Sequence, residues 1–238
     1  MIRVIMSLIL IIPIFSANAE VSSGSGADQG TTARVAQKTD GQNYSVRHYD
    51  AILNPDPKKR QASADCDLFI DNNGSFGTYG EELIRTTRNE DFKACFYEKI
   101  DFSYLCPSYS RFREEKKSQF LAFLFASMAT YESACRKGSS APGVNGKADG
   151  LFMLEYSQSQ RRAAGRDPKY CATNESVDTQ GITFQMQCAV SIFSKSHCGT
   201  GTKPGKNSSD YWQKLRPGSK GADRAITAMA KKFPDCGN

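Results

Sequence analysis

The sequence predicts a mainly α-helical domain that is stabilised by disulfides. Three observations indicate this fold class: apolar residues recur at helical spacing, strand patterns are scarce, and all eight cysteines lie between residues 66 and 236. An even number of cysteines is typical of a disulfide framework in an exported protein, although the spacing leaves the pairing open. No C-x-x-C pair occurs and the two histidines are far apart, so we expect neither a metal site nor a cofactor.

The first 19 residues have the features of a secretory signal peptide. Arg3 supplies a positive charge, residues 4–15 are apolar but too few to span a membrane, and residues 17–19 form an A-x-A cleavage site. No cysteine follows the expected cut, which argues against a lipid anchor. We therefore expect a secreted or periplasmic protein with no stable membrane anchor.

Residues 20–62 contain few large apolar side chains and many Ser, Gly, Thr, Asp and Gln, which predicts a flexible leader. The folded domain is then expected to span residues 63–238, long enough for one hydrophobic core. The full chain has a net charge of +6. Scattered basic residues suit an anionic partner such as a cell wall, a membrane surface or nucleic acid. Because no nucleic-acid-binding motif is recognisable, we expect no nucleic-acid partner. We also expect a monomer.

A buried helix is the centre of the predicted fold. Ser110, with Glu114 and Glu115 after it, is a candidate helix start, because a capping hydroxyl and early acids suit the positive end of a helix. Residues 120–131 are almost entirely apolar, which is typical of a helix buried on every side. Apolar spacing predicts the other helices: short helices over residues 80–97, a core helix over 182–193 and a last helix over 222–233. Residues 138–150, rich in glycine and proline, and residues 199–209 are expected to be loops. Because strand patterns are scarce, any β structure is expected to be a small ribbon in the first of these loops.

Two carboxylates frame the segment that follows this apolar run. Glu132 ends the run, and a turn that starts at Gly150 and ends at Glu155 begins eighteen residues later. A glycosidic oxygen must be protonated as its bond breaks, which requires a carboxyl group whose pKa is raised by apolar surroundings. A glutamate at the end of a buried helix, with a second carboxylate nearby, therefore indicates cleavage of a sugar bond. The alternative is a solvated glutamate at a helix end.

The pair Glu132-Ser133, a glycine-containing loop and the segment Gly150–Glu155 resemble the catalytic signature of goose-type lysozymes and soluble lytic transglycosylases. Thr179-Gln180-Gly181 is similar to the segment that opens the next helix in the goose-type branch. The resemblance implies a lysozyme-like helical fold that binds the glycan strands of peptidoglycan. It implies Glu132 as the general acid and Glu155 as the residue that assists the attacking water, and the residues expected to contact the glycan are Ser133, Gly150, Phe152, Met153, Tyr156, Thr179, Gln180 and, as a possible aromatic contact, Tyr211.

The chain departs from the family pattern at three points. Met153 takes the place of a glutamine, Glu155 takes the place of an aspartate, and the Ala-Tyr-Asn-x-Gly segment of many transglycosylases is absent. The expected activity is a lysozyme that hydrolyses the bond between N-acetylmuramic acid and N-acetylglucosamine. Two alternatives stay open: a lytic transglycosylase that uses Glu132 alone and forms 1,6-anhydro ends, and an inactive lysozyme-like protein that binds carbohydrate or acts as an inhibitor. A toxin or nucleic-acid binder is a further, weaker alternative.

Overall fold

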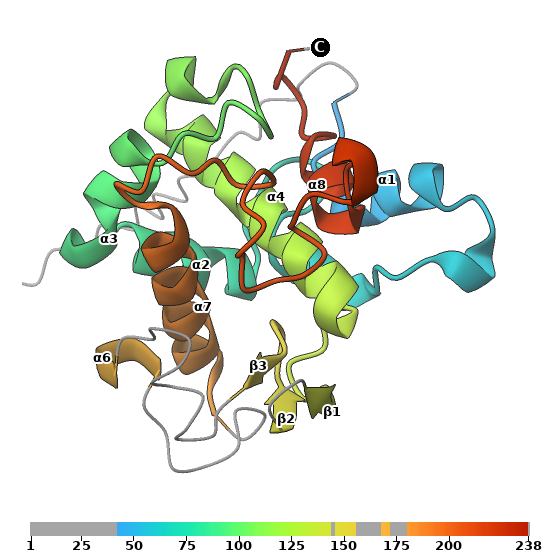
Figure 1. Ribbon diagram of the computed structural model, residues 1–238. Coiled ribbons are helices and arrows are strands. Elements are labelled where there is room, and N and C mark those ends of the chain that lie inside the picture. The colour runs from blue at the N-terminus through green and yellow to red at the C-terminus, as the bar shows by residue number, and fades with distance from the viewer. Residues whose placement is uncertain (1–41, 144–145, 156–167, 172–179, 238) are drawn as a thin grey trace, which may run out of the picture. The chain divides into compact units, whose positions relative to one another are not determined.

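The computed structural model describes residues 42–143, 146–155, 168–171 and 180–237 (Figure 1). Helices make up most of the regular structure of these residues, which confirms the expectation of a mainly α-helical fold. The described helices are α1 (Val46–Leu53), α2 (Thr78–Thr87), α3 (Glu90–Ala94), α4 (Glu114–Ser133), α6 (Pro168–Cys171), α7 (Ile182–His197) and α8 (Ala225–Ala230), and the strands are β1 (Ser140–Gly143), β2 (Gly146–Asp149) and β3 (Leu154–Glu155).

Helix α4 forms the centre of the fold, as its apolar sequence predicts. Its residues from Phe120 to Ala129 are buried on all sides. Helices α1, α2 and α8 pack against it, and it crosses the middle of the view in Figure 1. A helix with no polar face must be covered in this way, because burial of its side chains supplies most of its stability.

The start of α4 differs from the expected start at Ser110. Ser110 lies in a separate 3₁₀ turn, Tyr109–Arg111, and the helix begins at Glu114 after Arg113, whose side chain makes no capping hydrogen bond. Glu114 and Glu115 occupy the first turn, where their negative charges favour the positive end of the helix. The charges of these two residues therefore take the place of the expected hydroxyl cap.

The folded region extends further towards the N-terminus than residue 63. Tyr44 and Val46 are 2% and 0% exposed, and the Tyr44 ring packs edge-on against Phe233 at 5.7 Å between centroids. Ser45 caps α1 by accepting a hydrogen bond from the backbone of Arg47. The expected flexible leader is therefore wrong for residues 42–62, because a few large side chains complete the core despite the polar average composition. The expected signal peptide lies outside the described residues.

The two remaining core helices match their expected positions but not all their expected limits. Helix α7 includes the whole expected span and continues to His197, and it packs against α2 and α6. Helix α8 is shorter than the expected 222–233 and begins only at Ala225. The carboxylate of Asp223 accepts hydrogen bonds from the Tyr104 hydroxyl at 2.5 Å and from Lys231 Nζ at 2.8 Å, which holds the preceding chain outside the helix.

The expected β-ribbon is present as a small antiparallel sheet in the order β1-β2-β3. Ala141 of β1 pairs with Ala148 of β2, and Ala148 pairs with Glu155 of β3. Directly paired residues place their side chains on the same face of a sheet. Ala141, Ala148 and Glu155 therefore share one face.

Four disulfides cross-link the folded chain, as the even cysteine count predicts. They join Cys66 to Cys135, Cys95 to Cys198, Cys106 to Cys236 and Cys171 to Cys188. All the described residues belong to one compact unit that spans residues 37–238. Within the described part of the chain, none of the helices has the length and apolar character needed to span a membrane.

Candidate active site

The C-terminal end of α4 positions Glu132. The helix ends at Ser133, and the next two residues, Ala134 and Cys135, have φ angles of 54° and 60°. This left-handed conformation is unfavourable for residues with a Cβ atom, because the Cβ approaches the following carbonyl oxygen. Such strain persists where the surrounding structure enforces it, and it is common at functional sites.

Three interactions enforce this turn. The Cys135 amide donates a hydrogen bond to the Ala129 carbonyl at 3.0 Å, which closes the last turn of the helix. Cys135 is also joined to Cys66, and the Ser63 hydroxyl donates to the Ala134 carbonyl at 2.6 Å. Glu132 therefore lies on a backbone that is fixed by a disulfide and by hydrogen bonds on both sides.

Glu132 lines a cavity of about 630 Å³ at this helix end. Among the described residues that line the cavity, Glu132 is the one acidic side chain. No cluster of three or more His, Cys, Asp or Glu side chains that could hold a metal ion occurs within the described ranges. The lining residues are Gln61, Thr130, Tyr131, Glu132, Ser133, Ala134, Arg136, Gly138, Ser139, Ser140, Ala141 and Met153.

The surroundings of Glu132 change its acidity. Burial raises the pKa of Glu132 from 4.5 to about 7, and the positive charge of Lys214 acts in the opposite direction. A carboxyl group with this pKa is protonated in a substantial fraction of molecules at neutral pH. It can therefore donate a proton to a bound group, which is the property required of a general acid.

The segment that begins at Gly150 is held directly against the end of α4. The Ser133 hydroxyl donates a hydrogen bond to the Leu151 carbonyl at 2.8 Å, and the Leu151 amide donates to Gln185 Oε1 at 2.8 Å. The Gly150 amide donates to the Ser139 carbonyl, and Gly150 has a φ of 79°, which glycine adopts without strain. The structure therefore brings together the two halves of the sequence motif, with Ser133 as the connecting side chain.

The side chains of Phe152 and Met153 lie in different surroundings. Phe152 is 0% exposed, packs against Phe125 and Trp212, and is not among the residues that line the cavity. Phe152 was expected to line the wall beside a bound sugar, but its large ring belongs to the buried core and is not exposed at the cavity. Met153 does line the cavity, and its φ of 48° places it in the left-handed region.

Glu155 lies on the sheet beside the cavity rather than among its lining residues. It shares a sheet face with Ala141 of β1, which does line the cavity. Glu155 and Ala141 lie two strands apart, a backbone spacing of roughly 10 Å. A Cβ atom at Gly143 would lie 2.5 Å from Glu155 Oε1, so glycine is required there for the carboxylate to take this position. Glu155 thus reaches across the sheet towards β1.

A C-terminal segment fixes the Met153–Glu155 turn from outside. The Tyr211 hydroxyl donates a hydrogen bond to the Met153 carbonyl at 3.1 Å and accepts one from the Glu155 amide at 3.0 Å. The Trp212 indole donates to the Phe152 carbonyl at 3.0 Å. Tyr211 was expected to contact a sugar, but it is not among the lining residues and instead holds the turn.

A buried contact between two polar side chains anchors this C-terminal segment. His197 Nε2, at the end of α7, lies 2.7 Å from Asp210 Oδ1, and both side chains are almost completely buried. Asp210 immediately precedes Tyr211 and Trp212 in the chain. The segment that holds the turn is therefore attached to α7 as well as to the turn itself.

The remaining expected residues lie away from the cavity or outside the described ranges. Tyr156 and Thr179 belong to the residues that the structure does not describe. Gln180 is described, and its carbonyl accepts a hydrogen bond from Gln185 Nε2, but it is not among the residues that line the cavity.

Several residues at the site were not found by sequence reasoning. Gln185 is completely buried and joins α7 to Leu151 and to the Lys137 carbonyl. Lys214 acts on Glu132, and Gln61 and Arg136 line the cavity. A glutamine inside the apolar pattern of residues 182–193 was the available signal for Gln185. The other three residues lie in polar segments that have no comparable pattern.

Comparison with known proteins identifies a similar fold. No protein-family model and no curated protein matches the chain. Solved structures of a protein named Bd0314 DslA are similar to it: its wild-type form 2 has a TM-score of 0.49 at 21% identity, and a variant with glutamate replaced by glutamine has a TM-score of 0.50 at 20% identity. Each match covers 67% of this chain and 91% of the other. At this identity, the variant's TM-score of 0.50 shows a shared fold and nothing about function.

Proposed function

We propose that this protein is an exported lysozyme-type glycosidase that cleaves the glycan strands of peptidoglycan. The observation that carries the proposal is Glu132: it ends a buried helix, lines a cavity of about 630 Å³ and has a pKa of about 7. The fold is then lysozyme-like, and the motif Glu132-Ser133 with Gly150–Glu155 is its catalytic signature. The hydrogen bond from Ser133 to Leu151 supports this reading, because it joins the two parts of that motif.

In the proposed mechanism, Glu132 donates its proton to the glycosidic oxygen as the bond to the N-acetylmuramic acid sugar breaks. Glu155 accepts a proton from the attacking water, and the product has a reducing end. An inverting hydrolase requires its two carboxyl groups to be about 6.5–9.5 Å apart, so that a water molecule fits between them. The position of Glu155 on the sheet face shared with Ala141 supports this role, because Ala141 lines the cavity that holds Glu132.

One observation favours a second function. Glu155 does not itself line the cavity, whereas Glu132 does. If Glu155 takes no part in the reaction, the 6-hydroxyl of the sugar attacks instead and leaves a 1,6-anhydro end, as in a lytic transglycosylase.

Met153, in place of the family glutamine, is the feature that favours an inactive carbohydrate-binding protein.

Mass spectrometry of the soluble products separates these functions. Purified peptidoglycan, both acetylated and de-acetylated, is digested with the oxidised protein and with its Glu132→Gln and Glu155→Gln variants. Products with reducing ends that disappear in both variants support the lysozyme. Products one water lighter that persist in Glu155→Gln identify a transglycosylase. Release that is equal for wild type and Glu132→Gln, or no release from either wall, refutes the glycosidase proposal.

A further inference from the structure

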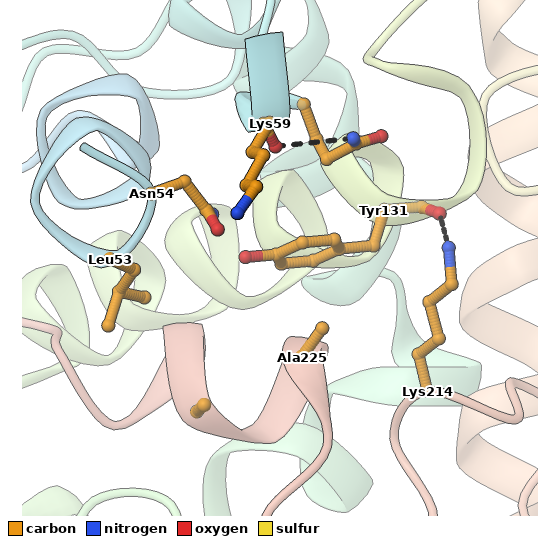
Figure 2. Close-up of a pocket in the computed structure, with 8 residues that line it drawn as sticks. Leu53, Asn54, Lys59, Tyr131, Lys214 and Ala225 are labelled. Atoms are coloured by element: carbon orange, nitrogen blue, oxygen red, sulfur yellow. Dashed lines mark hydrogen bonds between the residues drawn. The ribbon is translucent and has the colours of Figure 1, made fainter. Parts of the chain in front are cut away.

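A second cavity, of about 470 Å³, lies beside the first. Tyr131 and Gln61 line both cavities, and Tyr131 immediately precedes Glu132 in the chain. Figure 2 shows the Tyr131 ring extending into the second cavity between Lys59 and Ala225. The second cavity therefore shares part of its wall with the first and begins one residue from the proposed general acid.

The wall of this cavity is fixed by a buried carboxylate. Asp50 of α1 is 1% exposed, and its Oδ2 accepts hydrogen bonds from the backbone amides of Gln61 and Ala62, each at 2.8 Å. Its Oδ1 accepts a hydrogen bond from the Asn54 side chain, also at 2.8 Å. These bonds hold the chain after α1 beside Tyr131, so the cavity is formed before any ligand binds.

The charged side chains that line the cavity are both positive. Lys59 and Lys214 line it, and none of the described residues that line it is acidic. Lys214 Nζ donates a hydrogen bond to the Tyr131 carbonyl, which leaves further N–H groups of its ammonium for a ligand (Figure 2). The Tyr131 ring adds a flat apolar surface. Two ammonium groups around an aromatic ring suit a ligand that carries a carboxylate beside an apolar or sugar-ring surface.

We propose that the second cavity is an accessory subsite that binds a carboxylate-bearing substituent of the glycan strand, next to the bond that Glu132 acts on. This inference rests on the proposed function and adds to it the part of the substrate that is recognised. Peptidoglycan offers such carboxylates in two alternative forms: on the peptides that are joined by an amide bond to the lactyl group of its muramic acid, and on the lactyl group itself where no peptide is attached. Both sources present the same chemistry to Lys59 and Lys214.

The test compares Lys59→Gln with a matched control, Lys58→Gln. Lys58 is the neighbouring exposed lysine of the same 3₁₀ turn, and it does not line the cavity. Steady-state cleavage is measured on soluble glycan oligomers in three forms: with their peptides, after enzymatic removal of the peptides, and after amidation of all carboxylates. Lys59→Gln is expected to raise KM about two- to fivefold on carboxylate-bearing oligomers with kcat unchanged, the range of one exposed ion pair. Lys58→Gln is expected to match the wild type.

The three substrates also identify the source of the carboxylate. An effect of Lys59→Gln that appears only after peptide removal assigns the subsite to the lactyl carboxylate, which is free only then. An effect confined to peptide-bearing oligomers assigns it to the peptide, and an effect on both forms shows that either carboxylate is bound. In each case the effect must vanish on amidated oligomers. Ala228→Leu provides a second variant, since leucine is compatible with α8 and fills the cavity without a change of charge; it is expected to raise KM on the same oligomers.

Equal KM values for the wild type, Lys59→Gln and Ala228→Leu on every oligomer overturn the subsite and leave the glycosidase intact. An effect of Lys59→Gln that remains on amidated oligomers also overturns it, because the lysine then does not act through a carboxylate. A wild-type protein that cleaves none of the oligomers refutes the glycosidase itself, and the subsite with it.

Discussion

Replacing Glu132 by glutamine is expected to stabilise the protein at alkaline pH and to leave its stability nearly unchanged at acidic pH. In the folded protein the pKa of Glu132 is about 7, above the ordinary value of 4.5 that applies to the unfolded chain. Below pH 4.5 the carboxyl group is protonated in both states. As the pH rises towards 7, the unfolded chain loses the proton first, so the folded state becomes less stable.

The size of this effect follows from the two pKa values. A pKa of about 7 rather than 4.5 corresponds to about 3 kcal/mol of lost stability above pH 7. This figure is an upper value, because the side chain is partly exposed and keeps some hydration. Glutamine cannot ionise, so Glu132→Gln should regain this energy at pH 8. For a domain of this size, the gain corresponds to a rise in Tm of roughly 6–12 °C.

Thermal and urea unfolding of the oxidised protein at pH 4 and pH 8 measures this difference. Glu98→Gln is the matched control, because Glu98 is an exposed glutamate of the same domain. The control is expected to change the free energy of unfolding little at either pH. If Glu132→Gln alters stability equally at pH 4 and pH 8, the raised pKa of Glu132 is refuted, and with it the main support for a general acid.

Three further predictions concern the neighbours of Glu132 and the N-terminal part of the core. Lys214→Met removes a charge that lowers the pKa of Glu132, so the alkaline limb of the pH–rate profile should move to higher pH, whereas an unchanged limb would contradict the interaction. Tyr211→Phe removes both hydrogen bonds to the Met153–Glu155 turn; kcat should fall roughly tenfold with KM nearly unchanged, checked by kinetics and by a melting curve within a few degrees of the wild type. Tyr44→Ala should lower the free energy of unfolding, measured in urea, by about 3 kcal/mol. A decrease below about 0.5 kcal/mol would contradict the burial of Tyr44 in the core and support a flexible leader that includes residue 44.

The elements that could be predicted from sequence are those whose signal is local. The run from Phe120 to Ala129 has no polar face, so only a buried helix suits it, and residues 182–193 show the spacing of a core helix. Glu132 was identified because a carboxylate directly after a buried run is unusual. Glycine and proline marked the loop before Leu151, and the scarcity of strand patterns elsewhere left this loop as the place for a small ribbon.

The parts that could not be predicted depend on contacts between distant segments. Tyr44 completes a core cluster with Phe233, nearly two hundred residues away, and composition averaged over a polar stretch conceals such a side chain. Ser110 has the hydroxyl group of a helix cap, but it lies in a separate 3₁₀ turn before the helix. Tyr211 and Gln185 act through hydrogen bonds to backbone atoms of the turn, and a backbone partner leaves no pattern in the sequence.

Most of the disulfides join cysteines that are not neighbours in the series of cysteines along the chain. Three of the four disulfides skip over other cysteines: Cys66 joins Cys135 across Cys95 and Cys106, and Cys106 joins Cys236, the last cysteine of the sequence. Cys66 and Cys95 both precede their native partners, Cys135 and Cys198, so a chain that becomes oxidised from its N-terminal end offers them to each other first. A bond formed between them must later be broken by thiol–disulfide exchange. Native pairing is therefore favoured by such exchange, or by oxidation that takes place only after Cys236 is available.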